Sequence, residues 1–312
     1  MLRDVVEKAK RISTNYNDIE QAIRDAESVA SRRVPGCRLV VLSEPRPLFV
    51  IGDIHGDWPT LHKIASRIDA AVAEKGLGPE DYYIVFLGDY IDRGEYQIET
   101  LLSVALAYTI MDNVVVLRGN HEPPKGLEPY PHDFPYLLLT RLGPTKARRL
   151  YNLCMEFFDK LPLAAKLPKI LLMLHGGPPI EEVTEKADLH KLLRCPNGPP
   201  GDRVLEEILW NDPTEDADEW LPSPRGAGYL WGPMVTDAVL ERENIKAIVR
   251  AHEPCFNGYK FNHGGRVLTL FSCILPHYGN QAAGYLQLEE PWRLREEKAE
   301  VLRRYVRLVE AG

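Results

Sequence analysis

Short apolar runs recur along the chain, and five of them end beside a side chain that can bind a metal ion. Continuous β-prone runs bounded by glycine are typical of strands buried on both faces, so we predict strands at 48–51, 82–87, 114–117, 170–174 and 245–249. In open α/β sheets, ligands bind in the crevice at the carboxyl ends of the strands. We therefore expect one site built from the residues that follow these runs: Asp53, His55, Asp89, Asn120, His175 and His252.

Helical spacing of apolar residues alternates with these runs. We predict helices at 58–74, 97–111 and about 144–160, and further strands at 163–166, 169–174, 266–271 and 284–288, the last two suggesting a second sheet. Strands alternating with helices predict an α/β fold with helices on the faces of a sheet. We divide the chain into a helical lead-in (1–36), a catalytic domain (37–290) and a C-terminal amphipathic helix (291–312).

Two segments do not follow either pattern. Residues 123–136 carry five prolines and are expected to form an ordered loop. Residues 178–228 are rich in proline, glycine and charge, and their acidic stretch 215–219 is expected to be a solvated surface loop.

Composition limits the class of protein. The net charge of −7 over 312 residues argues against general nucleic-acid affinity. The N-terminus is charged where a signal peptide needs an apolar core, and the longest uncharged apolar run, 100–111, is too short to span a bilayer. The five cysteines are odd in number and show no paired spacing, which is typical of reduced thiols. We expect a cytoplasmic protein with no nucleic-acid or membrane partner.

The proposed ligand set indicates two metal ions. Carboxylate, imidazole and amide ligands without cysteine suit manganese, with iron or zinc as alternatives. Asp89 lies midway in the ligand order and can bridge two ions with its two oxygens. We assign one ion to Asp53, His55 and Asp89, and the second to Asp89, Asn120, His175 and His252. Such a pair, roughly 3.5–4 Å apart, stabilises the attacking and leaving oxygens of an in-line displacement.

The charge of this centre favours a phosphate substrate. Two divalent ions outweigh two aspartates and a hydroxide, and the arginines Arg93 and Arg225 add forks that match phosphate oxygens. We expect metal-bound water as the nucleophile and His121, beside Asn120, as the acid that protonates the leaving alkoxide. An imidazole near cations needs an anionic neighbour to keep its proton, and Asp92 is placed for that role.

Other phosphatase chemistries do not fit the sequence. No cysteine has an arginine six positions later, as a cysteine-nucleophile phosphatase needs, and no Walker-type loop is present. The one Asp-x-Asp pattern in the sequence, 216–218, lies in the acidic stretch and does not follow a predicted strand.

Three blocks, 52–56 (Gly-Asp-Ile-His-Gly), 88–94 (Gly-Asp-Tyr-Ile-Asp-Arg-Gly) and 119–122 (Gly-Asn-His-Glu), resemble the signatures of the phosphoprotein phosphatase (PPP) family of serine/threonine phosphatases. Later blocks at 175–177, 209–213, 225–232 and 250–253 follow in the family's order, so the resemblance covers roughly 47–290. It implies a calcineurin-like metallophosphoesterase fold, a central β-sandwich flanked by helices, with a dimetal centre at the strand ends. The family's metal ligands, acid pair and phosphate-binding arginines fall on the residues assigned above, and Asn120 also falls among its phosphate contacts.

The sequence also departs from that family. After 119–122 the familiar eukaryotic enzymes continue with a helix containing Tyr-Gly-Phe, where this chain has the proline-rich loop. The stretch 271–278 resembles the family's Phe-Ser-Ala-Pro-Asn-Tyr loop with two extra residues, and this resemblance places Tyr278 on the substrate rim. The resemblance implies a bare catalytic core of the prokaryotic kind.

Three functions remain open at this stage. The first is a metal-dependent phosphatase of phosphoserine and phosphothreonine proteins, with unidentified regulatory partners. The second is a symmetrical dinucleoside tetraphosphatase or phosphodiesterase on the same scaffold. The third is a scaffold that binds phosphoproteins without turnover. Such a scaffold is expected to have lost a metal ligand or the general acid, and this sequence retains all of them.

Overall fold

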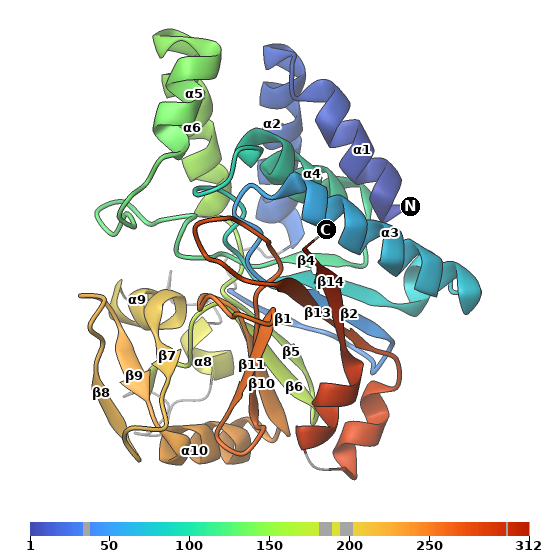
Figure 1. The fold of residues 1–312 in the computed structure, drawn as a ribbon, viewed down its shortest axis with the longest axis vertical. Helices are drawn as coiled ribbons and strands as arrows, with labels where there is room; N and C mark the ends of the chain where they lie inside the picture. The colour runs from blue at the N-terminus through green and yellow to red at the C-terminus, as the bar shows by residue number, and fades with distance from the viewer. Residues whose placement is uncertain (34–37, 181–188, 194–201, 298, 312) are drawn as a thin grey trace.

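The computed structural model of the chain describes residues 1–33, 38–180, 189–193, 202–297 and 299–311. Two β-sheets lie face to face at its centre, as the expected β-sandwich requires, with helices outside them (Figure 1). The five-stranded sheet has the order β14 (Val306–Glu310), β13 (Ala282–Leu288), β2 (Leu48–Ile51), β3 (Tyr83–Phe86), β4 (Val114–Val116). The six-stranded sheet has the order β1 (Leu39–Val41), β5 (Ala164–Leu167), β6 (Leu171–Leu174), β10 (Ala247–Arg250), β12 (Val267–Leu270), β11 (Tyr259–Asn262).

Alternation along each strand explains the layering. In β2, Phe49 and Ile51 pack among the N-terminal helices, whereas Leu48 and Val50 pack between the two sheets. Successive strand side chains point to opposite faces, so a run that is apolar throughout must be covered on both. The apolar runs of the sequence are therefore strands of a four-layer α/β/β/α molecule.

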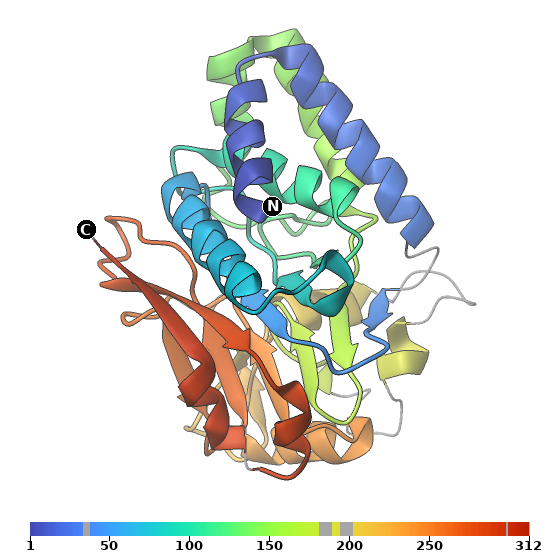
Figure 2. The same ribbon diagram turned by 90° about the vertical axis from the view of Figure 1, so that its right-hand side faces the viewer.

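The helices of the first half of the chain lie on the outer side of the five-stranded sheet and share one core with it (Figures 1 and 2). They are α1 (Leu2–Ile12), α2 (Tyr16–Arg33), α3 (Trp58–Glu74), α4 (Gln97–Ile110), α5 (Phe134–Leu142) and α6 (Pro144–Phe158). The expected helical character of the lead-in is confirmed over 1–33, and α1 contacts both α3 and α4. The N-terminal helices thus share one core with the sheet they cover.

The outer face of the six-stranded sheet packs against a second helical layer. This layer contains α8 (Leu189–Leu193), α9 (Asp202–Trp210) and α10 (Pro233–Glu243). A small third sheet beside it has the order β7 (Asp212–Pro213), β9 (Tyr229–Trp231), β8 (Trp220–Pro222). Short 3₁₀ segments occur at Pro79–Asp81, Pro291–Arg295 and Ala299–Tyr305.

All five predicted site-bearing strands are present, and their carboxyl ends meet. Strands β2, β3 and β4 are parallel to one another in one sheet, and β6 is parallel to β10 in the other. An isolated parallel bridge between Asp53 and Phe271 joins the two sheets at this end. The site therefore lies across two sheets. The second sheet suggested by 266–271 and 284–288 is present, but these two strands do not lie in it together, because β12 pairs with β10 and β13 pairs with β2.

The prediction of a C-terminal helix over 291–312 is wrong. The tail forms two 3₁₀ segments and then β14, which pairs antiparallel with β13. Val309 is buried in the helix-covered core, while Leu294 and Leu302 pack between the sheets. The open edge of β13 offers backbone hydrogen bonds and its side chains offer packing to β14, and this tertiary contact overrides the helical spacing.

Two loop predictions need correction as well. The loop expected at 123–136 ends earlier, since α5 begins at Phe134 with a proline in its first turn. The described part of 178–228 contains α9 and the third sheet, although residues 215–219 do form a largely exposed loop. Very short strands leave almost no periodicity to detect, and they form here only by pairing with one another.

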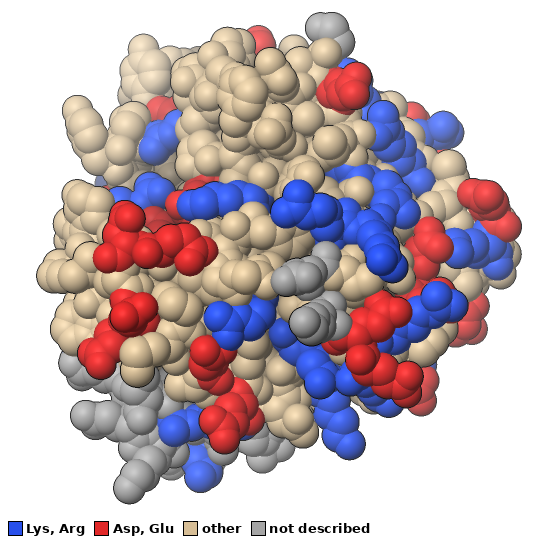
Figure 3. Space-filling model, turned by 60° about the horizontal axis from the view of Figure 1, so that its bottom comes forward, with Lys and Arg blue, Asp and Glu red and all other residues tan. Residues whose placement is uncertain are grey.

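Charges of both signs and buried thiols characterise the described part of the chain. Basic and acidic side chains are interspersed on the face shown in Figure 3. Within the described ranges, no helix has both the length and the apolar character to cross a membrane. Cys154, Cys255 and Cys273 are free and buried, whereas Cys37 and Cys195 lie outside the described residues.

Candidate metal centre and active site

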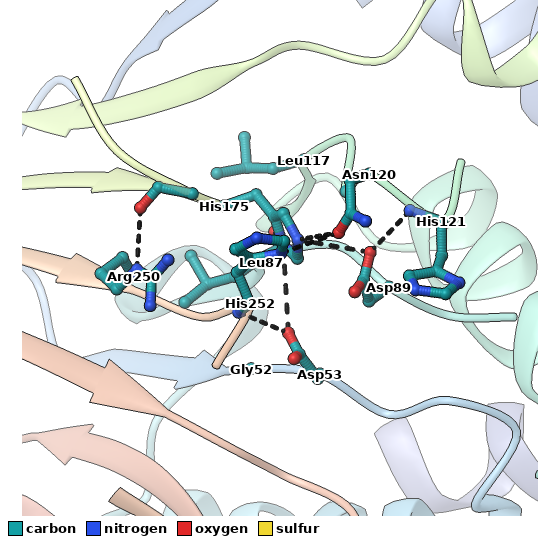
Figure 4. Close-up of polar contacts among 12 residues, drawn as sticks. Gly52, Asp53, Leu87, Asp89, Leu117, Asn120, His121, His175, Arg250 and His252 are labelled. Atoms are coloured by element: carbon teal, nitrogen blue, oxygen red, sulfur yellow. Dashed lines mark hydrogen bonds and ion pairs between the residues drawn. The ribbon is translucent and has the colours of Figure 1, made fainter. Parts of the chain in front are cut away.

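The six predicted metal ligands converge at the meeting point of the two sheets, and all are buried. Figure 4 shows five of them reaching a common centre from separate strand ends: Asp53, Asp89, Asn120, His175 and His252. The Asn120 oxygen Oδ1 lies 2.9 Å from His175 Nε2 and 2.9 Å from His252 Nδ1. His55 Nε2 lies 3.5 Å from Asp89 Oδ2. Asp53 Oδ1 accepts the backbone N–H of His252 at 2.9 Å, which ties the two sheets together.

The backbone at this centre is held in an unusual conformation. His55, Asp89, Asp92, Arg93 and His252 all have φ between 47° and 73°, in the left-handed region that non-glycine residues rarely adopt. Such residues cluster at functional sites because the surrounding structure holds them there. Close approach adds a further constraint, since a Cβ on Gly119 would collide with the backbone nitrogen of Asp89.

Hydrogen bonds fix two of the imidazole rings for metal binding. His175 Nδ1 donates to the carbonyl of Leu87 at 3.0 Å, and His55 Nδ1 donates to the carbonyl of Ile91 at 3.0 Å. A carbonyl only accepts, so each Nδ1 carries the proton and each Nε2 presents a lone pair to the centre. This is the outer hydrogen bond that usually orients a metal-bound histidine.

The atoms at the centre fit a cation. One polar atom of the Asn120 amide lies 2.9 Å from both His175 Nε2 and His252 Nδ1, and 3.2 and 3.3 Å from the two oxygens of Asp89. Among the described residues, Asp53 Oδ2 and His252 Nε2 are buried without a hydrogen-bond partner. Buried lone pairs facing one another without donors are costly, and divalent cations would satisfy them.

The metal-capable groups overlap at a single residue. One group contains His55, Asp89 and His121, and the other contains Asp89, His175 and His252, with ligand atoms within 4.8 Å of one another in each. Asp89 belongs to both groups, as a bridging carboxylate would. In the first group His121 stands where the sequence led us to expect Asp53, whose Oδ2 lies 3.9 Å from His55 Nε2.

Burial dominates the electrostatics of the centre. It raises the pKa of Asp53 to about 7, with help from the charge of Asp89, and it lowers the pKa of His55 to about 3. Burial also opposes ionisation of Asp89, but the His175 imidazole outweighs it and holds the pKa of Asp89 well below its usual value. The centre thus keeps the His55 imidazole neutral beside the charged Asp89 carboxylate, the forms that bind metal. At His175 burial lowers the pKa of the imidazole, but the carboxylates of Asp89 and Asp53 outweigh it, so the pKa is raised.

The predicted acid pair is in hydrogen-bond contact. His121 Nδ1 lies 2.6 Å from Asp92 Oδ2, and both residues are buried. Burial lowers the pKa of His121, but the nearby carboxylates of Asp89 and Asp92 outweigh it, so the pKa is raised. A His121 ring protonated on Nδ1 by this contact leaves Nε2 available on the other side.

The predicted phosphate contacts line the same pocket. A cavity of about 550 Å³ is bordered by Arg93, Arg225 and Tyr278 together with the metal-capable side chains other than His175. Arg93 Nη1 donates to the carbonyl of Pro131 at 2.6 Å, and Arg225 lies in the turn between β8 and β9. The ring of Tyr278 lies 6.0 Å from the ring of His55. The structure thus brings every predicted site residue to the pocket or to its buried floor.

Three supporting residues were not assigned from the sequence, although each lies in a recognised block. Asp212 accepts from Arg225 Nε and from Arg250 Nη2, both at 2.7 Å. Glu122 accepts the backbone N–H groups of Asp89, Tyr90 and Gly119, at 2.8, 2.8 and 3.0 Å. These buried carboxylates and the fully buried guanidinium of Arg250 hold the site residues in place.

His132 is different, because no motif pointed to it. It lies in the proline-rich loop, and its Nδ1 is 2.7 Å from Asp92 Oδ2. A histidine in an irregular segment gives no periodic signal from which a contact across the fold could be predicted.

Comparisons with known proteins agree with this geometry. Residues 46–256 match the model of the calcineurin-like phosphoesterase family. The chain is 34% identical over 245 residues to the serine/threonine-protein phosphatase 4 catalytic subunit of Saccharomyces cerevisiae, covering 76% of this chain and 73% of that protein. It is 31% identical over 272 residues to the serine/threonine-protein phosphatase PP1-delta of Caenorhabditis elegans, covering 87% and 83%. A protein serine/threonine phosphatase structure from S. cerevisiae, described as similar to human phosphatase PP5, superposes with a TM-score of 0.73 at 25% identity over 95% of this chain and 90% of that one.

Proposed function

This chain belongs to the calcineurin-like phosphoesterase family and, within it, to the PPP serine/threonine phosphatases, and we propose that it hydrolyses phosphoserine and phosphothreonine in proteins. The observation that carries the proposal is the buried convergence of carboxylate, imidazole and amide side chains on Asp89 and Asn120, an arrangement that a pair of cations would satisfy. The family and this set imply divalent metals. The relatives that match over most of the chain are serine/threonine phosphatases.

We assign the metal ligands as the sequence suggested. Asp53, His55 and Asp89 would hold one ion. Asn120, His175 and His252 would complete the second site with Asp89. Two divalent ions in this position supply an activated water and neutralise charge on the phosphoryl group. Manganese is the proposed metal, with iron or zinc as alternatives, because the ligands are carboxylate, imidazole and amide without thiolate.

The remaining side chains act on the substrate. Arg93 and Arg225 bind phosphate oxygens, and the 2.7 Å hydrogen bond that Arg225 Nε donates to Asp212 aims the guanidinium. Asn120 and Tyr278 complete the phosphate contacts from the floor and the rim of the pocket.

His121 donates the proton that the leaving alkoxide needs. Its Nδ1 is held by Asp92, so Nε2 is the nitrogen that faces the substrate. A serine or threonine alkoxide is a poor leaving group, so transfer of this proton lowers the activation barrier for hydrolysis. The proposed partners are phosphoproteins. We also propose a cytoplasmic location, where buried free thiols such as Cys154 remain reduced.

A substrate panel tests the assignment. Purified protein is assayed with a phosphoserine peptide, a phosphotyrosine peptide, 4-nitrophenyl phosphate and diadenosine tetraphosphate, each with added Mn²⁺, Zn²⁺ or Fe²⁺. The proposal predicts metal-dependent release of phosphate from the phosphoserine peptide. Activity on diadenosine tetraphosphate alone would overturn the assignment of phosphoproteins as substrates. No turnover of any substrate would favour a phosphoprotein-binding scaffold.

A further inference from the structure

Asp92 accepts more hydrogen bonds than its pairing with His121 needs. Its Oδ2 lies 2.6 Å from His121 Nδ1 and 2.7 Å from His132 Nδ1. Its Oδ1 accepts the backbone N–H groups of Asp133 at 2.9 Å and Phe134 at 2.8 Å. Three of the four donors therefore come from consecutive residues, at the end of the loop where the sequence departs from the PPP pattern.

The proton positions in this cluster follow from its chemistry. Burial opposes ionisation of Asp92, but the bonds from His121 and His132 outweigh it and hold the pKa of Asp92 below its usual value. A carboxylate only accepts, so both imidazoles present Nδ1–H to it. The other nitrogen of His132, Nε2, lies 3.0 Å from the hydroxyl of Tyr151 on α6, which anchors the ring from behind.

The same segment also holds the turn that carries Asp92 and Arg93. Both residues have left-handed φ, 65° and 73°. The carboxylate of Asp133 accepts from the backbone N–H of Arg93 at 3.2 Å and from Gln97 Nε2 at 3.0 Å. Arg93 Nη1 also donates to the carbonyl of Pro131. Segment 131–134 therefore contacts both Asp92, the partner of the general acid, and Arg93, a phosphate-binding arginine.

We propose that His132 is a positioning residue that sets the Asp92 carboxylate against His121 for proton transfer to the leaving group. The two backbone donors hold only Oδ1, and the carboxylate can still swing about that end. The Nδ1–H of His132 fixes Oδ2, the oxygen that His121 uses. The inference rests on the proposed function and adds to it a residue from outside the PPP signature blocks.

This placement links substrate contact to the acid. Residues 126–130 of the same loop line the pocket, and segment 131–134 follows them directly. His132 itself is almost enclosed, with 10% of its side chain exposed. Its role is therefore to orient groups that touch the substrate, and the loop that carries it is continuous with the pocket wall.

The test exploits leaving groups and two matched amides. His132→Asn places an amide N–H where Nδ1–H was, whereas His132→Gln places it near Nε2 and loses the bond to Asp92. We assay four proteins: the wild type and the variants His132→Asn, His132→Gln and His132→Ala. The substrates are a phosphoserine peptide, whose leaving alkoxide needs a proton, and 4-nitrophenyl phosphate, whose leaving phenolate does not. His62→Ala, at a partly exposed histidine that contacts Glu7 outside the pocket, is the control.

We expect His132→Ala and His132→Gln to lower kcat for the peptide by about 10–100-fold, the usual cost of losing a group that orients an active residue. KM and the rate with 4-nitrophenyl phosphate should change about twofold or less, and His132→Asn should retain most of the peptide activity. Equal loss on both substrates, or no loss on either, would contradict the inference. If His132→Ala does not fold, the contrast between Asn and Gln still decides. A wild-type protein inactive on the peptide but active on 4-nitrophenyl phosphate would instead count against the proposed function.

Discussion

The strand-end centre and the loop 123–134 contribute to the same pocket by different physical means. The metal-capable residues follow buried strands, whose apolar runs fix their position from the sequence alone. The loop has no periodic pattern, yet its last residues hold Asp92 and Arg93 through five hydrogen bonds of 2.6–3.2 Å. The strands position the metal-capable residues, which carry the chemistry. The loop fixes the orientation of Asp92, which holds the general acid, and of Arg93, which binds phosphate.

Removing the shared carboxylate should have the largest effect if the strand ends carry the chemistry. Asp89→Asn leaves one oxygen to serve two ions, so turnover of a phosphoserine peptide should fall by at least about 10⁴-fold. Treatment of the wild type with a chelator should have a similar effect, reversed by Mn²⁺. The control Asp112→Asn changes a fully exposed carboxylate that pairs with Arg33. Normal turnover by Asp89→Asn would show that the strand ends do not hold the catalytic ions.

The acid pair is where the two regions meet. His121→Asn should lower kcat for the phosphoserine peptide by roughly 10²–10⁴-fold, because the alkoxide then leaves without a proton. The rate with 4-nitrophenyl phosphate should fall much less. Steady-state kinetics with both substrates measure the difference, with His62→Asn as control. An unchanged peptide rate would remove His121 from the acid role.

The packing beneath the loop can be tested through stability. Leu138 of α5 is fully buried in the helix-covered core, and the neighbouring Leu139 is exposed. Leu138→Ala should lower the free energy of unfolding by about 2–5 kcal/mol, through lost burial and a residual cavity. Leu139→Ala should change it by about 0.5 kcal/mol or less. Urea denaturation of both variants measures the two changes in unfolding free energy. Equal changes would mean that the packing of α5 does not anchor the loop.

The smallest expected effect concerns Arg225, which is placed by a turn of the third sheet. Arg225→Lys keeps the charge but loses the planar fork, so KM for the peptide should rise about tenfold, or ~1.4 kcal/mol. Asp212→Asn should act in the same direction, because it removes the partner that aims the guanidinium. An unchanged KM in both variants would take Arg225 out of the phosphate site.

Predictability from the sequence follows the same division. Helix α3 was predicted at its observed bounds, and the five site-bearing strands were each found within two residues at either end. The assignment of strands to sheets was not predictable. Strands β12 and β13 have similar apolar sequences, and what separates them is the strand each pairs with, β10 or β2. Strand β14 was missed because its pairing partner, not its spacing, determines its form.

The site shows the same limit at the level of single residues. The convergence of Asp53, Asn120 and His252 could be expected, because each follows a buried strand. The contact of His132 with Asp92 could not, since it depends on the path of an irregular loop and joins residues that are 40 positions apart. Supporting carboxylates such as Glu122 lie in recognised blocks, but their backbone hydrogen bonds become visible only in the fold.

The most direct test of the account is a crystal of the protein grown with Mn²⁺ and measured for anomalous scattering. Two peaks roughly 3.5–4 Å apart, with one Asp89 oxygen or both facing the space between them, are the predicted result. A single peak, or none, among these six side chains would contradict it.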